Sequence, residues 1–260
     1  MGKTPLYYHA DYENYRFGIF HSFDPDRFPE FIKLVKNCEE ISSRVKLVSA
    51  PEAGREDLNL VHKQEYIEKV YYLEETEGFL TPDTPVLKKA PKAARRIVGG
   101  SLEAAKRIDE QKKVLNLGGL HHAGINSGEG FCIFNDVAVA AQHLVNNGKR
   151  VCVLDTDAHF GNGTMEIFLN SPDVLYISLH QDPRTLYPGE RVLSETGKEA
   201  GKGYSINIPM PKCATISEYY YAFEEIVKPI FYQYQPDVLI RNGGSDPHHS
   251  DPLADLALDM

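Results

Sequence analysis

Short apolar runs rich in β-branched residues alternate with longer helical stretches along the chain. Buried strands, each short enough to be covered on both faces, are predicted at Val114–Leu117, Val151–Leu154, Val174–Leu179 and Val238–Ile240. Helices are predicted between them, for example at Ala90–Asp109 and Asp136–Asn147. The first two strands and the helix between them should form one crossover, which implies parallel strands. The sequence therefore predicts an α/β fold: a single three-layer domain over residues 1–260, with a mostly parallel sheet and helices on both faces.

Polar, glycine-rich segments follow three of these predicted strands. GGLHHAGINSGEG comes after Val114–Leu117, DTDAHFGNG after Val151–Leu154, and RNGGSDPHH after Val238–Ile240. In parallel sheets, ligands bind beyond the carboxyl ends of the strands, which is where these segments fall. We therefore expect the three segments to contribute to one shared site.

Composition and charge narrow the classes of function. The chain has 260 residues, of which 42% are apolar and 25% charged, and a formal net charge of −9. No stretch approaches the roughly 20 apolar residues that span a bilayer, and the N-terminus lacks the apolar core of a signal peptide. We therefore expect a cytoplasmic protein with no membrane partner. The acidic balance argues against direct nucleic-acid binding and fits a cationic or lysine-bearing substrate. The scattered cysteines predict neither a disulfide framework nor a cysteine-zinc site.

The segment Asp155–His159 leaves the end of a predicted strand. In extended backbone, residues two apart point to the same side, so Asp155, Asp157 and His159 can converge. Together with Asp246, in the segment GGSDP, Asp157 and His159 would form a set of three ligands with one coordination position open. That arrangement is typical of a catalytic zinc site. The alternatives are a solvated polar turn at Asp155–His159 and a turn-forming aspartate before a proline.

Two adjacent histidines, His121 and His122, lie in the first glycine-rich segment. Neighbouring glycines let the backbone turn tightly there: Gly118, Gly119 and Gly124. Because the unperturbed pKa of histidine lies near neutrality, such a pair beside a metal can supply a general base and an electrostatic partner. The alternative is a pair of solvated loop histidines.

Taken together, four segments resemble the histone deacetylase family, which includes acetoin-utilisation and acetylpolyamine-deacetylase relatives. They are GGLHHAG…GEGFCIFND, LDTDAHFGNGT, SLH…YPG and GGSDPHHSDPL. They occur in the order of the family, and the resemblance runs from near the N-terminus to Met260. It implies an arginase/deacetylase-like fold and a zinc-dependent hydrolase that removes an acyl group from an amine.

The resemblance also implies roles for individual residues. It makes Asp157, His159 and Asp246 the zinc ligands, although iron(II) would suit the same ligands. His122 matches the general base, His121 its neighbour beside the metal-bound water, and Asp155 the carboxylate that orients His121. Asn162 matches the partner of His122, where relatives have aspartate, so we expect a less basic His122. A site for a monovalent cation, usually potassium, is implied at Asp155, Asp157, His159, Ser178 and Leu179.

Further residues match the substrate channel of the family. Phe131 and Tyr187 match its aromatic walls, with Gly130 next to Phe131. Asp83 matches a carboxylate at the rim that binds the substrate backbone, or else is a plain turn residue. Acetyl-lysine in a protein, an acetylpolyamine and another small acyl amine all remain open as substrates, as does a homo-oligomer.

The resemblance lacks one catalytic group. The family has an oxyanion-stabilising tyrosine in a glycine-rich loop after the Asp246 segment, and none of the fifteen tyrosines here lies in such a setting. Because the chain stops at Met260, we expect a domain without its usual C-terminal segment, marginally stable unless something pairs with it. If Met260 is the true end, catalysis should fall by roughly 10²–10³, as when one oxyanion donor is lost.

Two other functions are compatible with parts of the sequence. Arginase-like ureohydrolases hold two manganese ions and show D-A-H-x-D and a later D-x-D, whereas Gly161 and His248 occupy the positions of the second aspartates here. One zinc per chain would support the deacylase, and two manganese ions the ureohydrolase. The other candidate is a zinc-binding module or pseudo-enzyme with little or no activity.

Overall fold

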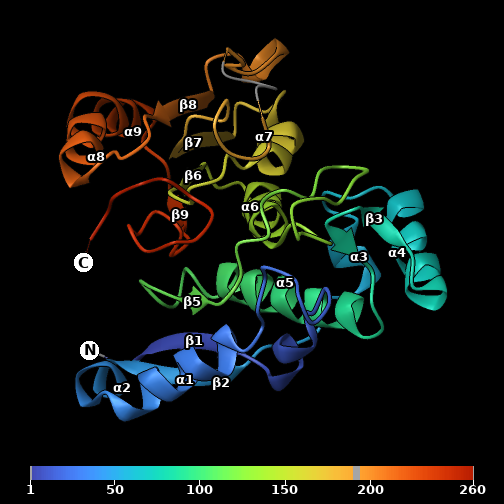
Figure 1. The fold of residues 1–260 in the computed structure, drawn as a ribbon. Helices are drawn as coiled ribbons and strands as arrows, with labels where there is room; N and C mark the ends of the chain where they lie inside the picture. Colours follow the sequence, from blue (N-terminus) through green and yellow to red (C-terminus); the bar gives the residue numbers. More distant parts are fainter. Residues whose placement is uncertain (1, 190–193, 260) are drawn as a thin grey trace. The chain divides into compact units, whose positions relative to one another are not determined.

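The computed structural model describes residues 2–189 and 194–259, which form two units, Met1–His143 and Leu144–Met260. Each unit contains a parallel sheet with helices on both faces (Figure 1). The predicted α/β class with mostly parallel strands is therefore confirmed. That residues 1–260 act as one catalytic domain stays a prediction.

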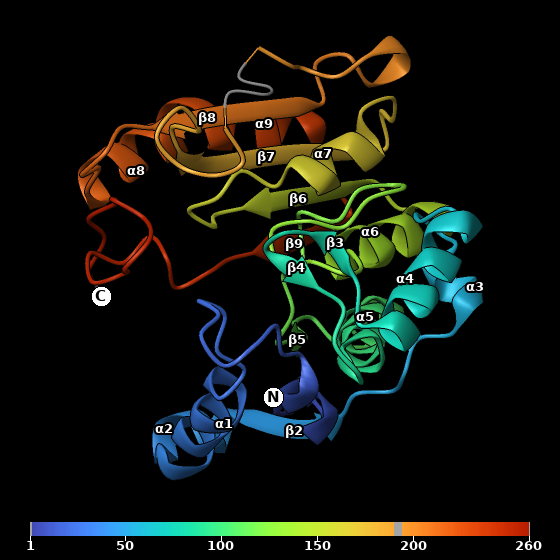
Figure 2. The same ribbon diagram turned by 45° about the vertical axis from the view of Figure 1, so that its right-hand side comes forward.

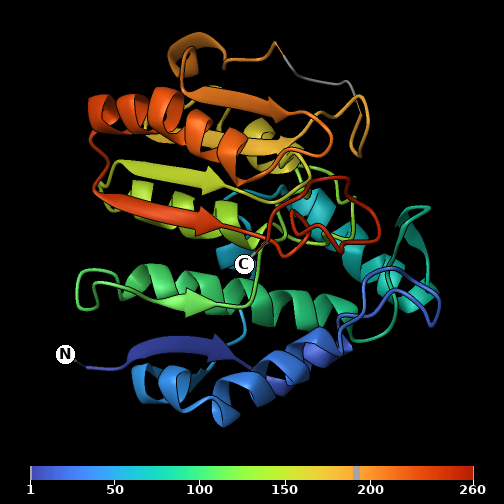
Figure 3. The same ribbon diagram turned by 60° about the vertical axis from the view of Figure 1, so that its left-hand side comes forward.

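In the first unit, Met1–His143, three parallel strands pair in the order β2-β1-β5. They are β1 (Thr4–Tyr8), β2 (Val45–Ser49) and β5 (Leu115–Asn116). Helices α1 (Arg27–Asn37) and α2 (Glu39–Arg44) cover one face, and α5 (Ala90–Lys106) covers the other (Figure 3). Leu6 packs against Ile32 and Val35 of α1, and its neighbour in β1 points to the opposite face.

The remaining elements of the first unit lie between β1 and α1 or between β2 and α5. They are the 3₁₀ helix η1 (Ala10–Asn14), α3 (Arg55–Leu58), α4 (Gln64–Thr76), and the antiparallel pair β3 (Phe79–Thr81) and β4 (Thr84–Pro85). Helix α6 (Asp136–Asn146) begins in this unit, directly after the histidine segment.

In the second unit, Leu144–Met260, four parallel strands pair in the order β8-β7-β6-β9. They are β6 (Val151–Asp155), β7 (Val174–Gln181), β8 (Ser205–Met210) and β9 (Val238–Asn242). Helix α7 (Asn162–Phe168) lies on one face (Figure 2). The other face carries α8 (Ile216–Ala222), a π-helical turn η3 (Phe223–Val227) and α9 (Lys228–Tyr234), and a short 3₁₀ helix η2 (Glu199–Gly201) precedes β8. Strands β6 and β7 are buried along their whole length, as their continuous apolar sequences predict.

The two strands of the predicted crossover, β5 and β6, belong to different sheets in the described residues and do not pair with each other. In the described residues, β5 is only two residues long and pairs with β1. Both edges of β6 are already hydrogen-bonded, one to β7 and the other to β9. A strand has only two edges, so β6 cannot also pair with β5. The sequence patterns did not predict five of the strands within residues 2–189 and 194–259, which are β1, β2, β3, β4 and β8. None of the helices in the described ranges is long and apolar enough to cross a membrane.

Candidate metal centre

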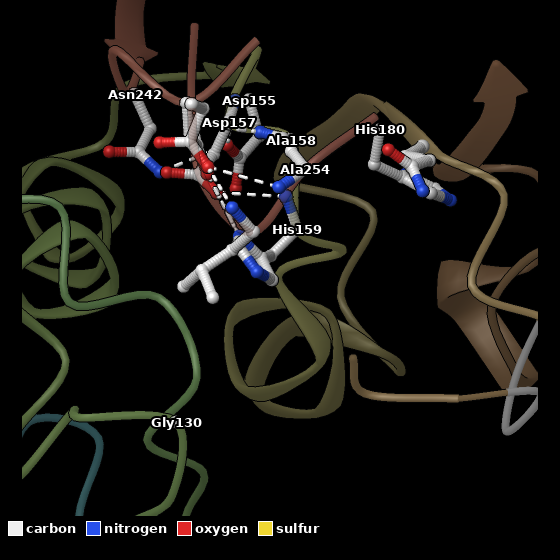
Figure 4. Close-up of polar contacts among 12 residues, drawn as sticks. Gly130, Asp155, Asp157, Ala158, His159, His180, Asn242 and Ala254 are labelled. Atoms are coloured by element: carbon white, nitrogen blue, oxygen red, sulfur yellow. Dashed lines mark hydrogen bonds and ion pairs between the residues drawn. The ribbon is translucent and has the colours of Figure 1, made fainter. Parts of the chain in front are cut away.

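Two carboxylates and one imidazole converge in the second unit. Ligand atoms of Asp157, His159 and Asp246 all lie within 4.8 Å of one another, and within residues 2–189 and 194–259 this is the one such group of acidic, histidine or cysteine side chains. His159 Nδ1 is 3.2 Å from Asp157 Oδ1 and 2.8 Å from Asp246 Oδ2. The close-up shows Asp157 and His159 directed toward one another beside Asp155 (Figure 4). The structure thus brings together the three side chains that the sequence nominates as ligands.

The register of two neighbouring strands explains this convergence. Asp155, the last residue of β6, lies opposite Asn242, the last residue of β9. Because the strands are parallel, the segments that follow them leave the same edge of the sheet. The Ala158 amide then donates a hydrogen bond to Asp246 Oδ1 (3.1 Å), which ties the two segments together.

The site concentrates charge in a partly buried place, where each of its side chains is 17–18% exposed. Burial opposes protonation of His159, but hydrogen bonds from its ring to Asp157 and Asp246 raise its pKa to about 10. Burial, reinforced by the charge of Asp157, raises the pKa of Asp246 to about 6. Two neighbouring carboxylates need a cation between them, and without a metal the imidazolium supplies that charge.

The donor set fits a divalent metal ion. Zinc bonds to nitrogen and oxygen at about 2.0–2.2 Å, which places tetrahedral ligands roughly 3.3 Å apart. The separations of 2.8 and 3.2 Å around His159 Nδ1 are close to that value. Gly244 keeps the adjacent space open, since a Cβ there would overlap with Asp246 Oδ1 and Asp157 Oδ2. Metal binding would displace the proton of His159.

Asp155, next to the metal-binding cluster, is fully buried and hydrogen-bonded to the segment that carries the ligands. Its Oδ1 accepts hydrogen bonds from Asn242 Nδ2 (2.9 Å) and from the Asp157 amide (3.2 Å). Its Oδ2 lies 3.1 Å from the hydroxyl of Tyr176 on β7. Three donors from three places in the second unit fix the orientation of this carboxylate.

Other residues nominated in the second unit lie on the elements around the centre. Asn162 is the first residue of α7, and Ser178 and Leu179 are fully buried in β7. Ser178 lies opposite Asp155 in the sheet, and its hydroxyl is 2.8 Å from His180 Nδ1. Tyr187 is partly buried and precedes a cis peptide bond to Pro188.

The histidine pair lies in the first unit and is buried, with His121 3% and His122 5% exposed. Their ring centroids are 4.2 Å apart. Gly119 adopts φ of 109°, which suits glycine, and its carbonyl accepts a hydrogen bond from the His121 amide. The interpretation as solvated loop histidines is wrong, because both side chains are almost entirely buried.

Phe131 is held in an unusual backbone conformation. Its φ is 66°, a left-handed value that is strained for a bulky residue, and Gly130 before it has φ of 55°. The Phe131 carbonyl accepts from Tyr15 Oη (2.6 Å), and its amide donates to Thr84 Oγ1 (3.1 Å). Such strain persists only where the surroundings impose it, and it is common at ligand-binding positions.

Asp83 lies in the turn between β3 and β4. Its Oδ1 accepts hydrogen bonds from the hydroxyls of Thr81 and Thr84. The His21 ring, which packs edge-on against Phe131 with centroids 4.5 Å apart, lies 2.9 Å from the Asp83 carbonyl. The carboxylate therefore serves the turn in this structure, and its role at a substrate rim remains a prediction.

Several supporting residues were missed by sequence reasoning. They are His62, Asn135, Asp136, Tyr176, Asn242 and Gly244. Asn242 and Gly244 lie within the polar segment RNGGSDP, so their position at the end of a predicted strand was a usable signal. His62 lies outside every motif considered, and only the fold brings it to the histidine segment.

Comparison with known proteins extends over nearly the whole chain. The family model described as Histone deacetylase domain matches residues 21–260. The Acetoin utilization protein AcuC of Bacillus subtilis (strain 168) is 35% identical over 270 residues, covering 99% of this chain and 70% of that protein. The protein of the same name in Staphylococcus aureus (strain MRSA252) is 31% identical over 271 residues, covering 98% and 69%.

Two crystal structures share the fold. The HDA15 HD domain has a TM-score of 0.90 at 28% identity, covering 99% of this chain and 77% of that one. An acetylpolyamine aminohydrolase from Burkholderia pseudomallei has a TM-score of 0.85 at 25% identity, covering 98% and 86%.

Proposed function

Because the chain belongs to the histone deacetylase family, whose members are amidohydrolases, we propose that it removes an acyl group, foremost acetyl, from an amine by metal-dependent hydrolysis. The observation that carries this proposal is the convergence of Asp157, His159 and Asp246 in the second unit. Family membership alone would also fit a protein that has lost its metal site. A retained ligand set in suitable geometry argues for retained chemistry.

We propose zinc as the metal, held by Asp157, His159 and Asp246, with iron(II) as the other ion that these ligands suit. When bound, such an ion acts as a Lewis acid toward an acyl carbonyl and lowers the pKa of a water molecule. Asp155 keeps the start of this segment in place through the Asp157 amide and Asn242. The backbone of Ser178 and Leu179 is proposed to contribute to a monovalent-cation site with the same segment.

Proton transfer is assigned to the histidine pair. His122 is proposed to remove the proton from the attacking water, with His121 as its partner, and a protonated histidine to return a proton to the leaving amine. These roles rest on the place of the two residues in the segment GGLHHAG. Burial suits them, because it keeps bulk water away from the transferred proton. Asn162 is proposed to be the neutral partner of His122. We assign no residue of this chain to the oxyanion donor.

We propose a small acylated amine as the substrate class. One structural relative is named an acetylpolyamine aminohydrolase, and the net charge of −9 favours approach of a cationic amine. Phe131 and Tyr187 would provide apolar walls for the alkyl part of such a molecule. An acetyl-lysine side chain in a protein offers the same chemical group and is the second substrate to test.

The test combines metal content with turnover. The chain, purified and loaded with zinc, is assayed for hydrolysis of an acetylated polyamine and of an acetyl-lysine peptide by release of acetate. We expect one zinc per chain, loss of activity with a chelator, and recovery when zinc is returned. His122→Ala should lower kcat by about 10²–10⁴, the usual contribution of a general base, with zinc content unchanged.

His249→Ala is the matched control, because His249 is an exposed histidine three residues after Asp246 and outside the cluster. It should retain zinc and activity. One bound zinc with no hydrolysis of either substrate would overturn the proposal in favour of a zinc-binding module. Two bound manganese ions with hydrolysis of a guanidino compound would overturn it in favour of a ureohydrolase.

A further inference from the structure

A buried histidine outside the motifs, His62, contacts the segment that carries the histidine pair. His62 is 3% exposed and lies in the first unit, two residues before α4. Its Nδ1 is 2.8 Å from the Gly124 carbonyl oxygen, and its Nε2 is 3.0 Å from the Asn135 amide nitrogen. The ring therefore bridges the end of the histidine segment and the residue directly before α6.

These two partners fix the charge and tautomer of the ring. A carbonyl oxygen can only accept, so Nδ1 must carry a hydrogen. A backbone amide can only donate, so Nε2 must present a lone pair. Both requirements are met by one neutral tautomer, and burial lowers the pKa of His62 to about 4, although the Gly124 carbonyl opposes this shift. The ring therefore stays neutral, with its hydrogen on Nδ1, across physiological pH.

Asn135 extends the bridge to the histidine segment itself. Its Nδ2 donates to the Ala123 carbonyl (2.9 Å) and lies 3.4 Å from the His121 carbonyl oxygen. Its Oδ1 accepts from the Ala138 amide (2.8 Å) and so caps the first turn of α6. Since Nε2 of His62 accepts from the Asn135 amide, the imidazole orients the backbone of the residue whose side chain holds the histidine segment.

The other end of the histidine segment is held by Asp136, the first residue of α6. Asp136 accepts from the amides of Gly119 (3.0 Å) and Leu120 (2.7 Å) and from Ser101 Oγ (2.5 Å). The backbone from Gly119 to Gly124 is thus anchored on both sides of His121 and His122. With both flanks fixed, the backbone sets the directions in which the two side chains leave the chain.

We propose that His62 is a positioning residue, which holds Gly124 and Asn135 in the geometry that orients the His121–His122 pair. Its effect on activity rests on the proposed function, whereas its effect on the pair itself does not. Displacement of a catalytic group by about 1 Å can cost on the order of 100-fold in rate. A misdirected base should lower kcat more than it raises KM, because substrate binding does not depend on that proton transfer.

The test compares two substitutions of His62. His62→Leu removes both hydrogen bonds at similar volume, and His62→Gln can still donate to Gly124 and accept from Asn135. We expect kcat to fall about 10- to 100-fold in His62→Leu, with KM within about twofold, and to recover at least partly in His62→Gln. Val70→Ala, at a fully buried position of α4, controls for lost stability and should leave kcat unchanged.

A measurement independent of activity accompanies the kinetics. In wild type, long-range ¹H–¹⁵N spectra should show His62 protonated at Nδ1 only, from pH 8 down to pH 5, and His62→Leu should shift the His121 and His122 ring resonances. If wild type hydrolyses no acyl amine, the proposed function fails while these spectra still decide the inference. An ordinary titration of His62 near pH 6.5, or unchanged His121 and His122 resonances in a folded His62→Leu, would overturn it.

Discussion

Two imidazoles of this chain differ in charge: His62, buried in the first unit, is neutral, and His159, partly buried in the second, is protonated when no metal is bound. His62 meets a carbonyl and an amide, and burial lowers its pKa to about 4. Partial burial also opposes protonation of His159, but the carboxylates of Asp157 and Asp246 beside Nδ1 raise its pKa to about 10. The comparison teaches that burial alone does not decide the charge of a histidine, because the partners of the ring nitrogens do.

The histidine segment and the metal-binding cluster are also held in place by different kinds of interaction. The histidine segment is held by neutral hydrogen bonds from His62 and Asn135 to backbone carbonyls, which fix positions and add no charge there. The cluster of the second unit places like charges together, an arrangement that a cation must stabilise. The first arrangement suits proton transfer, and the second suits metal binding.

Asp157→Asn should have the largest effect on metal affinity, because it removes one of the two carboxylates beside His159. The substitution removes one anionic ligand at nearly constant volume and leaves His159 with one carboxylate. Outer-shell partners alone are worth about 10- to 100-fold in metal affinity or activity, so loss of a ligand should cost at least roughly 100-fold. The pKa of His159 should also fall toward its ordinary value. Competition with a chromophoric chelator measures the first effect, and NMR titration of the metal-free chain measures the second.

Asp173→Asn provides the control, because Asp173 is an exposed aspartate of the same unit, directly before β7. It should leave metal affinity and the titration of His159 unchanged. A wild-type zinc affinity in Asp157→Asn would mean that the ion binds elsewhere.

Gly244→Ala should have the second largest effect, since it fills the space beside the ligands without changing any charge. The new Cβ would overlap with the carboxylates of Asp246 and Asp157, so one of them must move. We expect a loss of zinc affinity within the roughly 10- to 100-fold range of substitutions around metal ligands. The adjacent Gly243→Ala is the matched control, because the three atoms nearest to its Cβ would belong to the guanidinium of the exposed Arg241, which can move aside. Equal affinities in the two variants would contradict the steric argument.

The sequence predicts the charged metal-binding cluster better than the neutral hydrogen bonds that hold the histidine segment. Asp157 and His159 follow the end of the buried strand β6, and the period of two in extended backbone directs them to one side. Asp246 follows β9, which was predicted as a buried strand but is partly exposed, with Leu239 and Arg241 at the surface. Strand adjacency then brings the third, because β6 and β9 pair in parallel. Short apolar runs in the sequence indicate where such strands end, and therefore where polar residues can gather.

His62 and Asn135 show why the neutral hydrogen bonds around the histidine segment were not predicted. A single buried histidine before a helix has no pattern, and its two partners lie 62 and 73 residues away. The strand pairing of β5 was missed for a related reason: two residues of strand contain too few side chains to specify a partner. Such contacts depend on tertiary packing, which overrides local preference.

The smallest expected effect is on the pH dependence of stability in the metal-free chain. The pKa of His159 rises from 6.5 to about 10 on folding, so its stabilising contribution is present below pH 6.5 and is lost as pH rises toward 10. The pKa of Asp246 rises from 3.8 to about 6, so its contribution is likewise lost between those values. His62 behaves in the opposite way: its pKa falls from 6.5 to about 4, and its contribution is lost as pH falls through that window.

Thermal unfolding of three metal-free chains separates these contributions. Wild type should lose stability as the pH rises above 6.5, and His159→Gln should flatten this dependence of stability on pH. His159→Gln should leave unchanged the loss of stability below pH 6.5 that is assigned to His62. His62→Gln should do the reverse, flattening part of the acid slope and leaving the alkaline one. Because other carboxylates also titrate at low pH, the alkaline slope gives the cleaner comparison. An alkaline slope unchanged in His159→Gln would contradict a charged His159, and the contrast between the two imidazoles would then reduce to burial alone.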